Sequence, residues 1–237
     1  MLLYIIRHAD PIYSPDSLTE LGLKQADALA ERLAVNGLDK VYSSPNMRAQ
    51  MTAKPTCDLL GLKYTVENWM SEDLAWRDFA CETENGGGMY WAIFGQTTKL
   101  KYDETIKSGG EWHESKILSK TNAKNGYKRI IDCSDEFIGR LGYKRIENNG
   151  YEIINANNDR VAAFCHQGFG TTWLSHLLEI PPHLFWPSFD MSHSSVTILE
   201  FQNYKNGRTS PKCLCLSDMS HIYKSSLPFK YNNYLDI

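Results

Sequence analysis

Residues Leu2 to Asp10, LLYIIRHAD, decide the fold. The unbroken apolar run from Leu2 to Ile6 predicts a β-strand that is buried on both faces, as the strands of parallel sheets are. The run stops at Arg7 and His8, which are costly to hold near a core unless they have partners. A first strand that delivers an arginine and a histidine to one place indicates a site at the end of that strand.

Strand-like and helix-like patterns then alternate. The predicted elements are, in order, a helix over 17–33, a strand ending at Ser43 and Ser44, a helix from Pro45 to about Leu60 and a strand over 63–66. Thr19 is the expected N-cap of the first helix, and Pro45 is expected at the first position of the second. This alternation is typical of a parallel sheet.

The second half of the chain returns to the same pattern after an interruption. The elements predicted there are a helix over 127–141, a strand over 161–164, a turn and helix after it, and two strands over 195–201 and 212–217. The segment from about 67 to 125 shows no sustained periodicity, which predicts an inserted lid of loops and short helices. We therefore expect one α/β domain over 1–237, a mainly parallel sheet with helices on both faces.

Composition excludes several classes of protein. The formal net charge of −3 argues against general affinity for nucleic acid or for anionic membranes. No stretch approaches the roughly 18 apolar residues of a membrane span. The six cysteines form no C-x-x-C pair, and no H-E-x-x-H motif is present, so we expect a cytoplasmic protein without a metal site. Composition leaves the oligomeric state open.

Polar groups follow three of the predicted strands. Arg7 and His8 end the first, Arg48 lies one turn into the helix after the second, and His166 with Gln167 follows the strand over 161–164. Ligands of open α/β sheets bind beyond the carboxyl ends of strands. Two guanidinium groups and two imidazoles in one cleft favour an anion, and the arginine fork suits phosphate. The sequence therefore predicts a phosphoryl site.

Four motifs, in this order and at these spacings, resemble the histidine phosphatase superfamily, which includes phosphoglycerate mutase-like enzymes. They are RHAD, LTELGLKQADAL, SSPNMRAQMTA and FCHQGFG. The resemblance covers about residues 1–75 and 158–225. It implies that His8 is a nucleophile that becomes phosphorylated, and that Arg7, Arg48 and His166 bind the phosphoryl oxygens. It also implies that neither a metal nor a cofactor is needed.

The family supplies a proton to the leaving group from an acidic residue after the third strand. Glu72 in NWMSEDLAW is the first candidate, because Trp69 and Trp76 can desolvate its carboxyl group and raise its pKa. Asp73 is the second candidate, and Glu82 and Glu84 are more distant alternatives.

The sequence departs from the family pattern at three positions. Ala9 replaces the glycine usual after the histidine, Ser14 stands where an asparagine contacts phosphate, and Gln167 stands where a small residue is common. We assign Ser14 and Gln167 to phosphate binding, although the Gln167 amide could equally face solvent. The remaining histidines are expected to be structural or exposed, namely His113, His176, His183, His193 and His221.

Three functions remain open. The first is a metal-independent phosphomonoesterase for a small phosphate ester. The second is a phosphoglycerate mutase, but SEDLAWRDF lacks the Glu-Arg-x-Tyr-Gly stretch of such mutases. The third is an inactive phosphate-binding protein, which retention of all four basic groups disfavours. Aromatic residues in the segment from about 69 to 125 suggest an apolar or ring-bearing leaving group.

Overall fold

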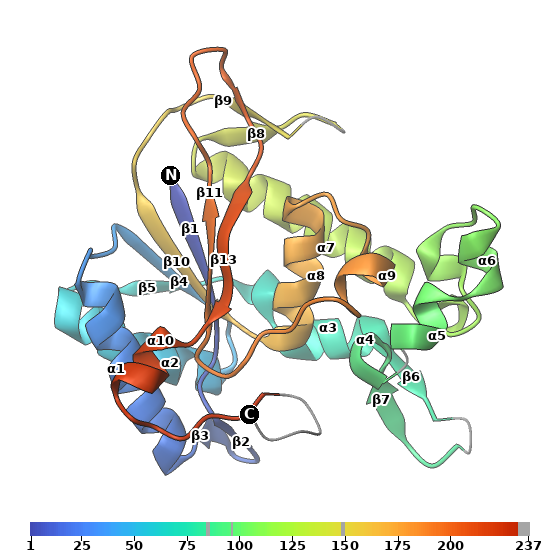
Figure 1. Cartoon of the computed structure of the whole chain (residues 1–237), viewed down its shortest axis with the longest axis horizontal. Helices are drawn as coiled ribbons and strands as arrows, with labels where there is room; N and C mark the ends of the chain where they lie inside the picture. Colours follow the sequence, from blue (N-terminus) through green and yellow to red (C-terminus); the bar gives the residue numbers. More distant parts are fainter. Residues whose placement is uncertain (84–85, 96, 148–149, 232–237) are drawn as a thin grey trace.

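A six-stranded, mostly parallel sheet forms the centre of the molecule (Figure 1). The computed structural model describes residues 1–83, 86–95, 97–147 and 150–231. The strands lie in the order β13 (Lys212–Asp218), β11 (Val196–Glu200), β1 (Leu2–Arg7), β10 (Arg160–Cys165), β4 (Lys40–Ser43) and β5 (Tyr64–Val66). Neighbours from β1 to β5 pair in parallel, whereas β11 runs antiparallel to both β1 and β13. The predicted fold class is thereby confirmed.

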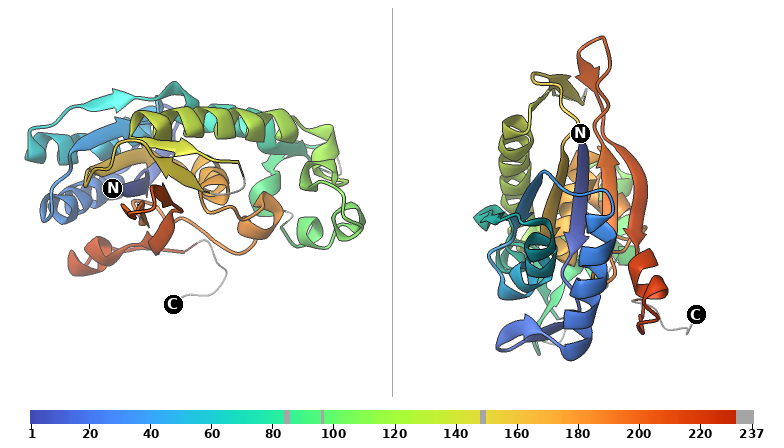
Figure 2. Two further views of the ribbon diagram at one scale, coloured as in Figure 1. Left: turned by 90° about the horizontal axis from the view of Figure 1, so that it is seen from above. Right: turned by 90° about the vertical axis from the view of Figure 1, so that its left-hand side faces the viewer.

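Alternate residues of the central strands face two hydrophobic clusters, as the two-residue period of a strand requires. On one face, Ile6 and Phe164 pack with Leu29 of α1 (Glu20–Ala34) and Ala53 of α2 (Met47–Leu60). The other face is larger, and its helices are α3 (Glu72–Phe79), α7 (Ala123–Arg140), α8 (Gln167–Leu177) and α9 (Pro182–Phe185). Helices therefore cover both faces (Figure 2), while the short α10 (Ser220–Lys224) packs on α1.

Helix caps agree with the sequence in one case and differ in another. Thr19 caps α1 by accepting a hydrogen bond from the Gly22 N–H at 3.0 Å. The predicted start of the next helix at Pro45 is wrong, because α2 begins at Met47. Asn46 keeps an extended backbone, with ψ of 135°, and its side-chain oxygen binds groups outside the helix. Pro45 therefore precedes the cap.

The segment after β5 carries short elements that the sequence did not resolve. They are η1 (Asn68–Met70), β6 (Ala80–Glu82), β7 (Met89–Trp91), α4 (Ala92–Gly95), α5 (Thr97–Lys101), α6 (Glu104–Lys107), η2 (Trp112–Glu114) and η3 (Leu118–Lys120). Figure 1 shows α5 and α6 at the side of the molecule farthest from α1 and α2. Buried Met70, Ile93 and Trp112 join the same cluster as Leu3 and Ile5 of β1, so the segment is packed on the domain. Its role as a lid stays a prediction.

Three small sheets complete the architecture, and one of them is the antiparallel pair of β6 and β7. The hairpin of β2 (Pro11–Tyr13) and β3 (Asp16–Leu18) follows β1 directly, and a three-stranded sheet is made by β12 (Arg208–Thr209), β9 (Tyr151–Ile153) and β8 (Tyr143–Arg145). None of the helices in the described residues is long and apolar enough to span a membrane.

Candidate active site

The carboxyl ends of β1 and β10 bring two histidines together. The rings of His8 and His166 lie 5.1 Å apart between centroids, and both side chains are buried. Arg7 and Arg48 are also buried, each with 6% of its surface exposed. Their charges help to lower the pKa of His166, which places all four groups in one electrostatic environment. The structure thus unites the four basic residues that the strand ends predicted.

His8 is held in one tautomer. Its Nδ1 lies 2.8 Å from the carbonyl oxygen of Ala9, which can only accept, so Nδ1 carries the proton and Nε2 keeps its lone pair. Burial, the neighbouring His166 and the charge of Arg7 hold the pKa of His8 well below its usual value. A neutral imidazole with a free Nε2 is the form that can attack phosphorus.

The backbone around His8 is fixed from three sides. The His8 N–H donates to the Cys165 carbonyl at 2.9 Å, and the His8 carbonyl accepts from the Ser194 N–H at 3.0 Å. The Ala9 N–H donates to Thr52 Oγ1 of α2 at 3.0 Å. These three hydrogen bonds fix the backbone on both sides of the ring, so His8 is positioned before any ligand binds.

His166 belongs to a hydrogen-bond chain. Ser44 Oγ donates to Asn46 Oδ1 at 3.1 Å, so at 2.7 Å it accepts from His166 Nε2. His166 Nδ1 is buried and has no hydrogen-bond partner among the described residues. Burial and the charges of Arg48 and Arg7 lower the pKa of His166. Once protonated beside an anion, Nδ1 could donate a hydrogen bond to it.

Some of the guanidinium N–H groups of each arginine donate hydrogen bonds to other residues of the protein. Arg7 donates from Nη1 to the Met191 carbonyl at 2.6 Å and from Nη2 to His193 Nε2 at 2.7 Å. Arg48 donates to Asp16 Oδ1 at 2.8 Å, and its guanidinium carbon lies 5.4 Å from the centre of the Tyr13 ring. The Nε atoms of both arginines are buried without a hydrogen-bond partner among the described residues. Each fork is therefore oriented and still has donors to offer.

Glu72 lies against the N-terminus of α8, beside His166. Its Oε1 accepts from the Gly168 N–H at 2.9 Å and its Oε2 from the Phe169 N–H at 2.8 Å. Burial raises the pKa of this carboxyl group, while the two backbone hydrogen bonds, Arg48 and Arg7 oppose the rise. The rise favours the protonated form of the carboxyl group, which is the form that a proton donor needs.

The alternative acids are placed elsewhere or not described. Asp73 is exposed and accepts a hydrogen bond from Asn46 Nδ2 at 3.0 Å. Glu82 is exposed in β6, and Glu84 lies outside the described residues. Of the four candidates, Glu72 therefore has the strongest structural support as proton donor.

A family model described as the histidine phosphatase superfamily, branch 1, matches residues 3–80 and 93–210. The chain belongs to this superfamily. The resemblance that the four motifs predicted is confirmed, and the matched residues include every basic group of the site.

Relatives and solved structures agree with this assignment. Phosphoserine phosphatase 1 of Hydrogenobacter thermophilus is 23% identical over 214 residues, which are 86% of this chain and 88% of that protein. A protein of Yersinia pestis named as a probable phosphoglycerate mutase is 31% identical over 78 residues, only 29% of this chain and 36% of that protein. The structure of a mycobacterial glucosyl-3-phosphoglycerate phosphatase has a TM-score of 0.62 at 18% identity and covers 91% of this chain and 98% of its own. At that identity the likeness shows the fold.

This histidine phosphatase has site residues that sequence reasoning missed. His193, expected to be structural or exposed, accepts a hydrogen bond from Arg7, and its ring lies 5.5 Å from that of His8. Burial and the charge of Arg7 lower the pKa of His193 to about 4. The available signal was that SHSS precedes a strand, because an antiparallel neighbour of β1 begins where β1 ends.

Ser14 and Gln167, the two predicted phosphate contacts that depart from the family pattern, are not grouped with the four basic residues in the way that those residues are grouped with one another. Ser14 is exposed in the turn between β2 and β3, so its role stays a prediction. Gln167 is the first residue of α8, and its amide donates a hydrogen bond to Asp190 Oδ1. Its side chain is therefore directed towards a protein carboxylate.

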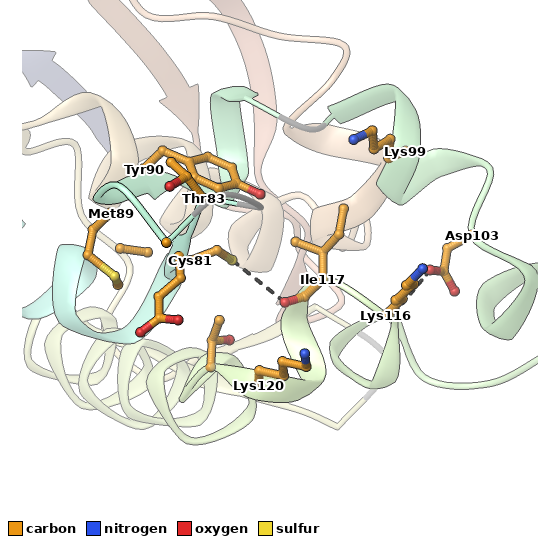
Figure 3. A pocket seen from close by; sticks show the side chains of 13 residues that line it. Cys81, Thr83, Met89, Tyr90, Lys99, Asp103, Lys116, Ile117 and Lys120 are labelled. Carbon is orange, nitrogen blue, oxygen red and sulfur yellow. Dashed lines mark hydrogen bonds between the residues drawn. The ribbon is translucent and has the colours of Figure 1, made fainter.

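A large cavity of about 820 Å³ lies in the segment after β5 and not at the basic cluster (Figure 3). Its lining includes Cys81 and Tyr90 from β6 and β7 together with three lysines, Lys99, Lys116 and Lys120. The Cys81 thiol donates to the Ile117 carbonyl at 3.6 Å across it. None of the described residues that line it belongs to the phosphoryl site. Within the described residues, no three histidine, cysteine or acidic side chains are grouped to hold a metal ion.

Proposed function

We propose that this histidine phosphatase hydrolyses a small phosphomonoester through a phosphohistidine on His8. The observation that carries the proposal is the hydrogen bond from His8 Nδ1 to the Ala9 carbonyl, which leaves Nε2 unprotonated. This nitrogen lies in a cluster with Arg7, Arg48 and His166, whose charges and donors suit a phosphoryl group. The protein's own side chains can supply every proton transfer.

The reaction divides into two displacements. His8 Nε2 donates its electron pair to phosphorus, the bond from phosphorus to the ester oxygen breaks, and Glu72 gives its proton to the departing alkoxide. Water then attacks the phosphorus of the phosphohistidine, Glu72 takes a proton from it, and the P–N bond breaks to restore His8. Donors on Arg7, Arg48 and His166 stabilise the equatorial oxygens, each contributing on the order of 3 kcal/mol.

The decisive test is to trap the intermediate. We expect purified protein mixed with a ³²P-labelled phosphomonoester and quenched in alkali to carry acid-labile label on His8. His8→Ala should lose the label and at least about 10³-fold in kcat/KM, because the nucleophile is gone. His113→Ala, in η2 of the inserted segment, is the matched control and should keep both. Label that persists in His8→Ala would overturn the proposal.

A phosphoglycerate mutase is the second candidate, favoured by the match to the Yersinia protein. A mutase would return the phosphoryl group from His8 to a second hydroxyl of the product. Incubation with 3-phosphoglycerate separates the two activities, since a phosphatase releases inorganic phosphate and glycerate whereas a mutase forms 2-phosphoglycerate. An inactive phosphate-binding protein would form neither product and no phosphohistidine.

We infer a cytoplasmic location for this activity. All six cysteines are free, and three of them are buried. Free thiols are typical of proteins in a reducing compartment. Expression of a fusion to a fluorescent reporter, followed by fractionation, tests this location.

A further inference from the structure

A second cavity, of about 510 Å³, has Gln167, the residue after His166, in its lining. It is lined by Phe94 of α4, by Gln167 at the start of α8 and by the loop 186–190 that follows α9.

Two lining residues of the cavity adjoin the phosphoryl site along the chain. Gln167 directly follows His166, and its amide is bound to Asp190. The next residue, Met191, gives its carbonyl oxygen to Arg7 Nη1 at 2.6 Å. These links connect the cavity to the residues that would hold a phosphoryl group, and they make it a candidate space for the group esterified to that phosphoryl.

The lining combines aromatic rings with one negative charge. Phe94 and Phe189 are 39% and 40% exposed, which is unusual for such large apolar side chains. Each is nevertheless packed from behind, Phe94 against Trp91 with ring centres 5.9 Å apart and Phe189 against Phe185 at 4.7 Å. These rings are supported by neighbours and still have open faces.

The charge of the lining selects against acids. Asp190 accepts hydrogen bonds from the Gln167 amide and from the Met191 N–H. The described residues that line the cavity include neither lysine nor arginine. The charge of Asp190 acts on Arg7 of the phosphoryl site. Once Arg7 binds the phosphoryl group, a carboxylate placed in the cavity would be repelled by both the phosphoryl group and Asp190.

We propose that this cavity is the leaving-group subsite and that it selects esters of ring-bearing alcohols without a carboxylate. The inference rests on the phosphatase proposed above. A ring stacked on Phe94 or Phe189 would bury apolar area on both partners, and offset or edge-to-face contacts add to that gain. The substrate class therefore differs from phosphoserine and phosphoglycerate, whose carboxylates Asp190 would repel.

The test compares three phosphate esters of primary alcohols: benzyl phosphate, ethyl phosphate and phosphoglycolate. We expect kcat/KM for benzyl phosphate to exceed that for ethyl phosphate by at least about 10-fold, from burial of the ring. Phosphoglycolate should be the poorest of the three. Because these alcohols resemble one another around the ester oxygen, the ratios report the subsite more than the chemistry.

Substitutions at three lining residues make the assignment specific. Phe94→Ala and Phe189→Ala should each lower the benzyl-to-ethyl ratio by about 3-fold or more, and the milder Phe94→Leu and Phe189→Leu should lower it in the same direction if alanine impairs folding. Asp190→Asn should raise phosphoglycolate relative to ethyl phosphate. Tyr204→Ala is the matched control, since Tyr204 is exposed between β11 and β12 at the opposite end of the sheet.

The outcomes separate this inference from the proposed function. If no ester is hydrolysed and His8 takes up no label, the phosphatase proposal fails. If ethyl and benzyl phosphate are hydrolysed equally well, or phosphoglycolate is preferred, the phosphatase stands and the subsite assignment is wrong. Ratios that stay unchanged in both phenylalanine variants would also overturn it.

Discussion

A single backbone carbonyl decides what His8 can do. Nδ1 donates to Ala9, so the lone pair of Nε2 is available without any acidic partner. The two buried arginines that suit a phosphate also lower the pKa of both histidines. The free site therefore holds neutral imidazoles. An incoming anion would relieve the repulsion between the two arginines and would favour protonation of His166 at Nδ1.

Glu72→Gln should cause a loss of activity that depends on the leaving group. Ethyl phosphate needs a proton on its departing oxygen, so we expect a loss of about 10² to 10⁴ in kcat, whereas 4-nitrophenyl phosphate, with a stabilised leaving anion, should lose much less. Steady-state kinetics on the two esters measures the difference. Asp73→Asn is the matched control. If Asp73→Asn and not Glu72→Gln lowered kcat selectively for ethyl phosphate, Asp73 would be the proton donor.

In the proposed mechanism, His8 and Glu72 set the pH profile. His8 must be neutral, and its lowered pKa keeps it so below its ordinary value of 6.5. Glu72 must be protonated, and its raised pKa keeps it so above its ordinary value of 4.5. Activity should therefore peak at acidic pH, with an alkaline limb from ionisation of Glu72. In Glu72→Gln the alkaline limb of the pH profile should disappear. If it survived unchanged, the limb would be due to the ionisation of another group.

Residues at the ends of parallel strands were predictable, while those brought by other elements were not. His8 and His166 follow strands whose carboxyl ends must share one edge of the sheet. His193 precedes β11, and its place beside His8 depends on β11 being the antiparallel neighbour of β1. Asn46 accepts from Ser44 and from the Glu72 N–H, a link between segments that no local pattern encodes.

At the level of elements, a short hairpin gives Arg48 its orientation. Asp16 of β3 accepts from Arg48 Nη1 and from the Met47 N–H at 2.7 Å, so one carboxylate holds both the side chain and the first turn of α2. The sequence indicated phosphate binding by Arg48 from its position alone. It did not reveal the hairpin, because three-residue strands are too short to show a period.

The contact between α3 and α7 depends on one glycine. A Cβ added at Gly126 would lie 2.3 Å from Cβ of Asp78, which is fully buried and accepts hydrogen bonds from Arg129 and Asn122. We expect Gly126→Ala to lower the free energy of unfolding by about 1 to 3 kcal/mol, through forced separation of the helices. Urea denaturation monitored by circular dichroism measures this change.

The same helix supplies the control. Gly139 is exposed in α7, and a Cβ added there meets nothing within 4 Å. Gly139→Ala should therefore leave stability unchanged or raise it by up to about 1 kcal/mol, because alanine loses less backbone entropy in a helix. Equal effects of the two substitutions would show that close approach to Asp78 is not the cause.

Across the whole molecule, the inserted segment was the hardest part to predict. Its apolar residues follow no helical or strand period, yet the Trp112 ring packs edge-on against Tyr127 of α7 and Trp186 after α9, at 5.3 Å from each. Aromatic packing between short elements is set by the surfaces already present and leaves no periodic trace in the sequence. The sheet, by contrast, follows from local patterns, because each of its central strands is buried on both faces.

Stability of the whole molecule should fall as the solution becomes acidic, because its buried histidines are neutral in the folded protein. His221 accepts from Arg32 at Nδ1, 3.3 Å away, and its Nε2 lies 3.0 Å from Oγ of Ser194, whose N–H holds the His8 carbonyl. Burial and the charge of Arg32 lower the pKa of His221 to about 4, against the opposing charge of Asp218. Between about pH 4 and pH 6.5, the unperturbed pKa of histidine, His221 binds a proton in the unfolded chain but not in the folded chain.

The free energy of unfolding should therefore decrease as pH falls through this window, with a share of at most about 3 kcal/mol from His221. His221→Gln keeps a donor for Ser194 and cannot titrate, so its stability curve should fall less steeply between pH 6.5 and 4.5. Urea titrations at intervals of half a pH unit measure the slope for both proteins. Between pH 7 and 8 the difference in free energy of unfolding between the two proteins should stay constant. This constant difference measures the effect of the substitution on packing, and any change below pH 6.5 measures the effect of proton binding. Parallel curves below pH 6.5 would show that His221 is protonated in the folded protein and would contradict the buried neutral network.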